Sequence, residues 1–590
     1  MAASDVPDVS SPPRVKNRIM IRVILKAFLL TILTVAAGLS PVSLVSHAQQ
    51  STPTLTGEWV GNSEPAGRSE FLGFSLTENG GELVRPLKAK LTLVQREGDR
   101  VRIELSSLKL VMTGTLAGDV IEGEAEVPGT KARFRLVRTV KVAPEILARY
   151  VGAYRFRNGD YIVIDRFPNT HDTLWVTDVK SGQARTIFPR SETQFTGGPA
   201  LYVISPTRQT LTFSPAAFRG SSPTVREGSS SRASGALADG RTTAPAGVHV
   251  VDLDVKGRQS GAFATRVNIR QEEVTFKNGD VTLSGTLLLP PAKGKRPALV
   301  FVHGSGAQSR EMYWGLGYLY AARGFAVLAY DKRGVGKSTG NWREASFQDL
   351  ADDAVAGAKF LQARAGVAAN QIGFWGQSQG GWIAPLAASR FPEAAFAVAL
   401  SGGGLSPADT ELFDSEFELI KAGYTADEVK EALAFQKLKN EIIGSADKWD
   451  EYTKARAIAK DKKWFRHRGI DVYGAEKRDD PFWTHMRRSY VYDPAPTLRA
   501  SPAPLLAIFG ELDSPEGVKA NVRAIRQILD QAGRKDYIVR VYPNGSHNLM
   551  EVPPDNPNEY VRLKRFPPGF FETMVDWTTT QLRRRALARR

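Results

Sequence analysis

The pattern of apolar and polar positions divides the chain into a β-rich first part and a second part in which strands alternate with helices. In the first part, short runs with an apolar residue at every second position, such as 89–95 and 160–165, are separated by Gly, Asn and Asp. This alternation is typical of antiparallel strands that bury one face. We therefore expect residues 49–219 to form an antiparallel sandwich or small barrel, either as one domain with two halves or as two modules.

The pattern changes after a segment rich in Ser, Gly, Ala, Thr and Pro that has few large apolar residues. This composition is typical of a linker, which we place at residues 220–269. From residue 270 onward, short apolar runs such as 298–302 and 326–330 alternate with helical stretches. Buried strands between helices predict a parallel sheet, so residues 270–590 are expected to be an α/β domain.

The strand pattern is interrupted once within this α/β domain. After three glycines at 402–404, a charged, helix-favouring stretch continues to about residue 495, and strand-like sequence resumes at 505–509. An insertion at the carboxyl ends of the strands is positioned to act as a lid, which we place at residues 404–495. Its aromatic residues either line a pocket or pack the lid, and the sequence does not separate these alternatives. They are Trp464, Phe465, Trp483 and Tyr490.

A nucleophile motif lies between a strand and a helix of this domain. Residues 376–380 read Gly-Gln-Ser-Gln-Gly, directly after the apolar run 372–375 and before a helical stretch. Small residues two positions before and after Ser378 let the backbone make the sharp turn that exposes a serine hydroxyl. Ser378 is therefore the candidate nucleophile.

Two further strand ends carry the candidate acid and base. Asp513 follows the strand-like run 505–509, and His547 follows the last such run, 537–542. The order Ser, Asp, His along the chain is one that a hydrolytic triad uses. Glu511 and Glu516 compete with Asp513 for the role of acid, and position favours Asp513.

A glycine-containing loop, His303-Gly-Ser-Gly, follows the strand-like run that ends at Val302. Its backbone N–H groups, at Ser305 and Gly306, together with the N–H of Gln379, are the expected donors to an oxyanion. We interpret His303 as a residue that shapes this loop rather than as a second base.

Composition narrows the remaining classes of function. The 590 residues include no cysteine, which excludes disulfides, thiolate metal sites and a cysteine nucleophile. The net charge is +16, but residues 1–26 contribute +3 and the last eight residues +5. Half of the excess therefore lies at the two ends, and no nucleic-acid motif accompanies it. The Gly-Lys-Ser at 336–338 lacks the preceding glycine of a phosphate-binding loop, so no nucleotide cofactor is expected. No other cofactor and no metal site are expected either.

The basic start of the chain has the marks of an export signal. A thirteen-residue apolar run, 27–39, follows the basic segment, and Ser46-His47-Ala48 resembles a cleavage site. We expect residues 1–48 to be removed, with Met20 as an alternative start. The alternative is an uncleaved membrane anchor, and without it no stable membrane insertion is expected.

Several of these motifs together resemble the α/β-hydrolase superfamily. Within it, they resemble secreted bacterial esterases and related serine peptidases that carry a helical insertion before the acid. The resemblance covers about residues 270–590 and implies a Ser378–Asp513–His547 triad that hydrolyses its substrate through an acyl-enzyme. The motifs are Val302-His-Gly-Ser-Gly, Tyr330-Asp-Lys-Arg-Gly-Val-Gly-Lys-Ser-Thr-Gly, Gly376-Gln-Ser-Gln-Gly-Gly, Gly510-Glu-Leu-Asp and Gly545-Ser-His.

The resulting expectation is an exported bacterial serine hydrolase, periplasmic or secreted, that cleaves a small carboxylic ester. A serine aminopeptidase or dipeptidyl-peptidase acting on short peptides is the alternative enzyme. A catalytically silent envelope binding protein is the alternative outside the enzymes. No nucleic-acid partner is expected in any of the three.

Overall fold

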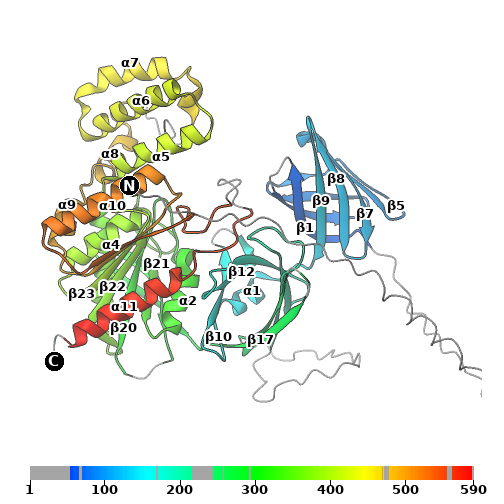
Figure 1. Cartoon of the computed structure of the whole chain (residues 1–590), viewed down its shortest axis with the longest axis horizontal. Helices are drawn as coiled ribbons and strands as arrows, with labels where there is room; N and C mark the ends of the chain where they lie inside the picture. Colours follow the sequence, from blue (N-terminus) through cyan, green and yellow to red (C-terminus); the bar gives the residue numbers. More distant parts are fainter. Residues whose placement is uncertain are drawn as a thin grey trace, which may run out of the picture. The chain divides into compact units, whose positions relative to one another are not determined.

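The computed structural model describes residues 54–587 with several gaps. The gaps are 66–68, 168–169, 215–243, 255, 257, 292–293, 468–469, 471–476 and 554–560. Strands of the described part form three sheets, two of them all-antiparallel and the third mostly parallel (Figure 1). The expected export signal at 1–48 and residues 220–243 of the expected linker lie outside the described residues.

The first sheet has nine antiparallel strands in the order β4-β3-β2-β1-β9-β8-β7-β6-β5. Alternate side chains of these strands form one hydrophobic cluster, which includes the fully buried Trp59. The strands, with one short helix, are β1 (Gly57–Pro65), β2 (Glu70–Thr77), β3 (Gly80–Arg85), β4 (Ala89–Lys90), β5 (Leu93–Glu97), β6 (Arg100–Leu105), η1 (Ser106–Leu108), β7 (Leu110–Ala117), β8 (Val120–Val127) and β9 (Thr130–Thr139).

The second sheet is a closed antiparallel barrel of eight strands in sequence order. A short helix, α1 (Pro144–Tyr150), precedes it, and Leu147 and Tyr150 of this helix belong to the same hydrophobic cluster as the barrel's inward residues. The strands are β10 (Gly152–Phe156), β11 (Tyr161–Phe167), β12 (Thr170–Asp178), β13 (Ala184–Pro189), β14 (Gln194–Gly197), β15 (Gln209–Ser214), β16 (Gly247–Leu253) and β17 (Gln259–Arg266). The antiparallel β region expected from the alternation is therefore present as two sheets.

The expected linker at 220–269 is wrong in its second half, where β16 and β17 complete the barrel. Strand β17 pairs with both β16 and β10, so it closes the ring. Its sequence, Gln-Ser-Gly-Ala-Phe-Ala-Thr-Arg, has small residues at most of its apolar positions, and only Ala264 is buried. The pairing partners on both sides, rather than its own apolar content, make this segment a strand.

The third sheet has eight strands in the order β18-β19-β21-β20-β22-β23-β24-β25. The first two are antiparallel, and the strands from β21 to β25 run parallel. The strands are β18 (Arg270–Asn278), β19 (Val281–Leu289), β20 (Arg296–Val302), β21 (Ala326–Tyr330), β22 (Val367–Gln377), β23 (Ala394–Leu400), β24 (Leu505–Gly510) and β25 (Tyr537–Tyr542). The α/β domain predicted from residue 270 onward is thus present.

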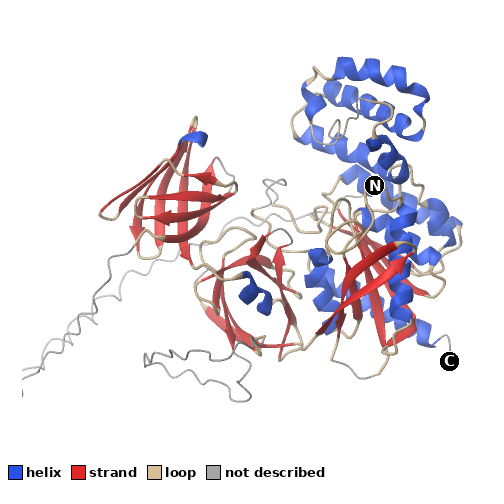
Figure 2. Ribbon diagram, turned by 180° about the vertical axis from the view of Figure 1, so that it is seen from behind, coloured by secondary structure: helices blue, strands red, loops and turns tan. Residues whose placement is uncertain are grey.

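Helices cover both faces of this sheet (Figure 2). Successive residues of β20 alternate between two hydrophobic clusters: Leu299 and Phe301 pack with α2 and α11, whereas Ala298 and Val300 pack with α3, α4 and α10. These helices, with the shorter ones beside them, are η2 (Arg310–Tyr313), α2 (Trp314–Ala322), α3 (Phe347–Gln362), α4 (Gln379–Arg390), α9 (Ala495–Ala500), α10 (Pro515–Gln531) and α11 (Phe570–Leu587).

The expected helical insertion lies between β23 and β24 and has a hydrophobic core of its own. Trp464, Phe465 and Trp483 are buried in that core, which settles their role as packing residues. Its helices are α5 (Pro407–Lys421), α6 (Ala426–Gly444), η3 (Ala446–Lys448), α7 (Trp449–Ala459), η4 (Lys463–Arg466) and α8 (Pro481–Ser489). Among the helices of the described ranges, none combines the length and apolarity needed to cross a membrane.

The barrel and the α/β domain share one hydrophobic cluster. Helix α2 lies between them: Leu319 belongs to the same cluster as Ile164 and Leu174 of the barrel. The half-buried Asp165 carboxylate also accepts the N–H of Gly315 at 2.6 Å, near the start of α2. The barrel therefore covers apolar side chains that a free α/β domain would expose to water.

A chain that begins at Arg270 is expected to unfold at a lower urea concentration than the full chain, or to aggregate. Each large apolar side chain that it exposes costs about 1.5–3 kcal/mol. A chain that begins at Ala143 retains the barrel and is the matched control, because the first sheet has its own core. Tryptophan fluorescence during urea denaturation measures both. Equal midpoints for the two truncated chains would contradict the shared core.

Candidate active site

Ser378 occupies the sharp turn between β22 and α4, with φ of 58° and ψ of −124°. A positive φ is unfavourable for a residue with a Cβ and persists only where the surrounding structure holds it. The N–H of Ser378 donates to the carbonyl of Leu400 at 2.9 Å, and its carbonyl accepts the N–H of Gly381 at 2.7 Å. The serine is thereby held at the N-terminus of α4, where the helix dipole is positive.

The two flanking glycines are required by close backbone contacts. A Cβ on Gly376 would lie 2.1 Å from the carbonyl oxygen of Gly380, and a Cβ on Gly380 would lie 2.6 Å from that of Val302. Contacts this short do not occur between non-bonded atoms, so any larger residue would force the turn open. The glycine spacing in the sequence therefore has a direct steric cause.

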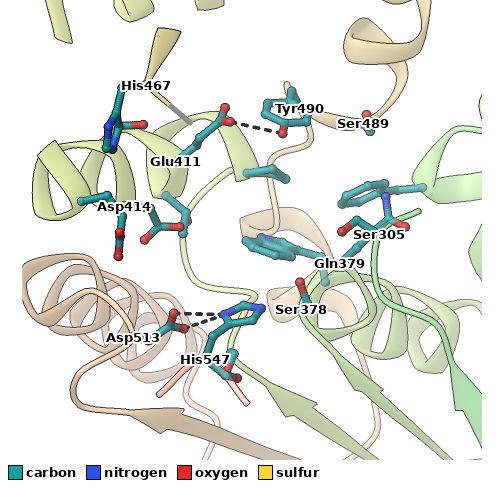
Figure 3. Close-up of a pocket in the computed structure, with 17 residues that line it drawn as sticks. Ser305, Ser378, Gln379, Glu411, Asp414, His467, Ser489, Tyr490, Asp513 and His547 are labelled. Atoms are coloured by element: carbon teal, nitrogen blue, oxygen red, sulfur yellow. Dashed lines mark hydrogen bonds and ion pairs between the residues drawn. The ribbon is translucent and has the colours of Figure 1, made fainter. Parts of the chain in front are cut away.

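Asp513 and His547 are brought together by the ends of two neighbouring strands. Asp513 follows β24 and His547 follows β25, which pair in parallel. The Nδ1 atom of His547 lies 3.0 and 2.9 Å from the two carboxylate oxygens of Asp513. Figure 3 shows the other side of the imidazole ring directed toward the Ser378 hydroxyl. The three residues expected from the sequence thus lie together in one array.

The two alternatives to Asp513 as the acid, Glu511 and Glu516, make other contacts. The carboxylate of Glu511 accepts the N–H of Asn544 at 3.4 Å, and that of Glu516 pairs with Lys519 at 2.7 Å. His303 is buried edge-on against the Tyr330 ring, and burial lowers its pKa to about 3. A histidine that stays neutral and packed in this way fits the expected role of shaping the loop.

Two side chains that the motifs did not single out support the backbone at His547. The Gln377 amide and the Ser401 hydroxyl both donate to the carbonyl oxygen of His547, at 3.1 and 2.9 Å. Gln377 directly precedes the serine, and Ser401 follows β23, so neighbouring strand ends hold the histidine loop. Only a three-dimensional arrangement identifies this contact, because the residues are far apart in sequence.

Three backbone N–H groups near Ser378 are not used by the fold. Those of Ser305, Gly306 and Gln379 donate to no acceptor in the part of the chain that the structure describes. Gly306 has φ of +79°, which a glycine adopts without strain. In contrast, the N–H of Gly304 is engaged by the side chain of Gln308 at 2.8 Å. The expected oxyanion donors are therefore available, and Gly304 is not one of them.

A buried lysine, which the sequence analysis did not consider, lies behind these donors. The Lys332 ammonium donates to the carbonyls of Gly304 and Gly306, at 2.7 and 3.2 Å, and to the side-chain oxygen of Gln379 at 2.7 Å. It occupies the second position of the Asp331-Lys-Arg-Gly segment, which was noted only as part of a motif. Burial lowers the pKa of Lys332 to about 7.

A cavity of about 620 Å³ opens over Ser378 and His547, and the lid supplies one of its walls. Helix α5 contributes Glu411, Asp414 and Glu418, whose spacing of three and four residues places them on one helix face. Figure 3 labels the first two of these residues. Tyr490 lines the cavity as well, and its hydroxyl donates to Glu411 at 3.5 Å. Among the described lining residues there is no lysine or arginine.

Two carboxylates of this wall, those of Glu411 and Asp414, are shifted toward their neutral forms. Burial, with the neighbouring Asp513 charge as a second cause, raises the pKa of Asp414 to about 7. Burial also raises the pKa of Glu411. The i, i+3, i+7 spacing of these acids in the lid sequence was a signal that could have been followed. We call Glu411, Asp414 and Glu418 the acidic wall.

Neither tryptophan beside the serine is exposed. Trp375 is buried, and its indole N–H contacts the sulfur of Met574 at 3.4 Å. Trp382 is 8% exposed, lines the cavity and donates to the carbonyl of Leu405 at 2.7 Å. No group of three or more His, Asp or Glu side chains in the described ranges is arranged to hold a metal ion.

Comparison with known proteins agrees with this fold. Residues 299–563 match the family model described as the alpha/beta hydrolase family. The match includes the strands that carry Ser378, Asp513 and His547, together with the lid. This part of the chain is therefore an α/β-hydrolase domain, preceded by an all-β region.

Among characterised relatives, the chain is similar to esterase EstD of Thermotoga maritima. The two are 22% identical over 347 residues, which cover 56% of this chain and 75% of the relative. Similar solved structures include hypothetical protein PA2218 from Pseudomonas aeruginosa (19% identity, 53% of this chain and 94% of that one, TM-score 0.33). Acetyl xylan esterase 1 from Thermoanaerobacterium sp. is another (17% identity, 54% and 89%, TM-score 0.30). With TM-scores below 0.5, neither structure carries weight in the assignment, which depends on the family match and the sheet.

Gly376→Ala is expected to destabilise the protein by about 1–3 kcal/mol, because the added methyl group must displace the backbone at Gly380. Gly366→Ala is the matched control: its Cβ would meet only the end of the Arg296 side chain, at 4.0 Å. Thermal unfolding followed by circular dichroism compares the two variants. A Gly376→Ala protein as stable as the control would contradict the steric account of the turn.

Proposed function

We propose that the protein is a serine hydrolase that cleaves a carboxylic ester through an acyl-enzyme. The observation that carries the proposal is the array of the strained Ser378, the Asp513–His547 pair and the unused N–H groups of Ser305 and Gln379 in one cavity, with that of Gly306 beside them. The similarity to an esterase supports an ester as the substrate.

In the proposed first step, His547 takes the proton of the Ser378 hydroxyl as the oxygen attacks the ester carbonyl. Asp513 accepts a hydrogen bond from Nδ1, which leaves the far nitrogen of the ring free to act as the base and stabilises the imidazolium that forms. The developing oxyanion accepts hydrogen bonds from the N–H of Gln379 and from the Ser305 and Gly306 turn, each worth roughly 3–4 kcal/mol in comparable sites. His547 then protonates the leaving alcohol.

In the second step, water replaces the alcohol. His547 takes a proton from this water as it attacks the acyl carbonyl, and the same N–H groups hold the second oxyanion. Collapse of the tetrahedral intermediate releases the acid and returns the proton to Ser378. The bond broken in the whole reaction is the ester C–O bond, and water supplies the atoms added.

Ser378→Ala is expected to lower kcat for p-nitrophenyl acetate by about 10⁴-fold or more and to abolish labelling by a fluorophosphonate. Asp513→Asn should lower kcat by about 10⁴-fold while the protein stays folded. Ser389→Ala is the control, because Ser389 lies on the same helix and only bonds the carbonyl of Leu386. An active Ser378→Ala variant would refute the nucleophile. An unlabelled and inactive native protein would instead favour the catalytically silent binding protein.

The acidic wall favours a second candidate, a serine peptidase that binds the amino group of a short peptide. Carboxylates at one side of the cavity, with no described lysine or arginine lining it, would attract a substrate cation. Aminoacyl nitroanilides with a free amine would then be cleaved, and their N-acetylated forms would not. If nitrophenyl esters are turned over and aminoacyl nitroanilides are not, the result supports the esterase.

The charge of the acidic wall is expected to depend on pH around neutrality. Asp414 is neutral below its raised pKa of about 7 and ionised above it. The ratio of kcat/KM for a choline ester to that for its uncharged 3,3-dimethylbutyl isostere should therefore rise as pH increases through 7, since neither substrate titrates. In Asp414→Asn this rise should be lost. A ratio that does not change with pH in the native protein would show that Asp414 does not contact the substrate.

A further inference from the structure

Lys332 is an unusual residue to find behind an active site. Its side chain is 2% exposed, and no carboxylate lies within ion-pair distance of its ammonium in the described ranges. The neighbouring Asp331 and Arg333 instead form ion pairs with Arg310 and Asp353, at 2.8 and 2.7 Å. A buried and unpaired cation is costly, so a chain that needed only packing here would be more stable with an apolar side chain.

The three acceptors of Lys332 belong to the two segments that supply the oxyanion donors. Two are carbonyls of the loop after β20, and the third is the side chain of Gln379, the residue after the nucleophile. One ammonium therefore ties together two segments that are about seventy positions apart in sequence. The separation of their N–H groups is therefore fixed by this ammonium together with the pairing of β20 and β22.

Because the peptide bond is planar, this contact also fixes the direction of the N–H group of Ser305. The carbonyl of Gly304 and the N–H of Ser305 belong to one peptide unit and point in opposite directions. Because Lys332 binds that carbonyl at 2.7 Å, the Ser305 N–H is directed away from the lysine. Ser305 lines the cavity, so this is the side from which an oxyanion would approach.

Water has little access to the lysine. The ring of Trp342 lies 5.5 Å from the ammonium, and His485 of lid helix α8 packs edge-on against that ring at 5.9 Å. His485 Nδ1 also lies 2.6 Å from the carbonyl oxygen of Arg343, which fixes the lid helix to this loop. The titratable groups near the lysine are Asp353, His303 and His485. Asp353 pairs with Arg333, and burial lowers the pKa of both histidines, so none of these three supplies a counter-charge in contact with the ammonium.

We propose that Lys332 is the positioning residue of the oxyanion hole and that its charge is compensated only when the oxyanion forms. This inference rests on the proposed function, since it requires acyl transfer at Ser378. A cation that lacks a counter-charge in the resting enzyme and gains one in the transition state lowers the barrier without strengthening substrate binding.

The test is Lys332→Met, which removes the charge and all three donors but keeps a side chain of similar length. We expect kcat for p-nitrophenyl acetate to fall about 10²-fold, with KM within about twofold of the native value. The inhibition constant of a trifluoromethyl ketone, which forms a tetrahedral oxyanion adduct with serine, should rise by about the same factor. All rates are divided by the concentration of sites titrated with a fluorophosphonate, so that unfolded protein does not affect the measured kcat.

Two further variants make the result specific. Lys337→Met removes an exposed lysine from the same loop and should leave both constants unchanged. Gln379→Leu keeps the backbone N–H but removes one acceptor of Lys332. It should lower kcat about tenfold, and adding Lys332→Met to it should cost less than in the native protein.

A Lys332→Met enzyme whose kcat and inhibition constant both stay within about threefold of native would overturn the inference, as would a change confined to KM. If that variant does not fold, Gln379→Leu decides alone, and unchanged constants again overturn it. Failure of the proposed function gives a different result: the native protein itself would show neither fluorophosphonate labelling nor turnover.

Discussion

The positive φ of Ser378 is imposed by the atoms that surround it. Backbone hydrogen bonds on both sides of the serine, and glycines that touch the neighbouring backbone, hold a conformation that an isolated serine would avoid. The second half of the strand before the serine and most of the helix after it are buried. The strain is therefore borne by these local backbone contacts, which are held in place by the buried elements on either side.

The charged groups around this turn are separated, with positive charge on one side and negative charge on the other. A buried cation lies behind the backbone N–H groups, the serine and histidine lie in front of them, and carboxylates of the lid face the cavity from the other side. Such an arrangement stabilises negative charge at the reacting carbonyl and positive charge further out toward the lid. In the proposed hydrolase, this arrangement orients a substrate before any specific contact with its acyl group is made.

Much of this site could be predicted from the sequence because its parts lie at the ends of recognisable strands. Ser378, Asp513 and His547 each follow an apolar run, and parallel strands bring their carboxyl ends to one edge. Lys332 could not be found in this way, since a lysine in a charged loop gives no sign that tertiary packing will bury it. The same limit applies to β17, whose small residues become a strand only through pairing with two neighbours.

The lid has a hydrophobic core built from its own aromatic residues, separate from the two clusters that surround the catalytic sheet. Mutations that reshape the cavity wall on α5 therefore act on a helix that contributes to a different hydrophobic core from that around the serine turn. In the proposed hydrolase, selection for a new substrate can alter the lid while the serine turn is conserved. In evolutionary terms, the insertion makes specificity and catalysis separately adjustable within a single chain.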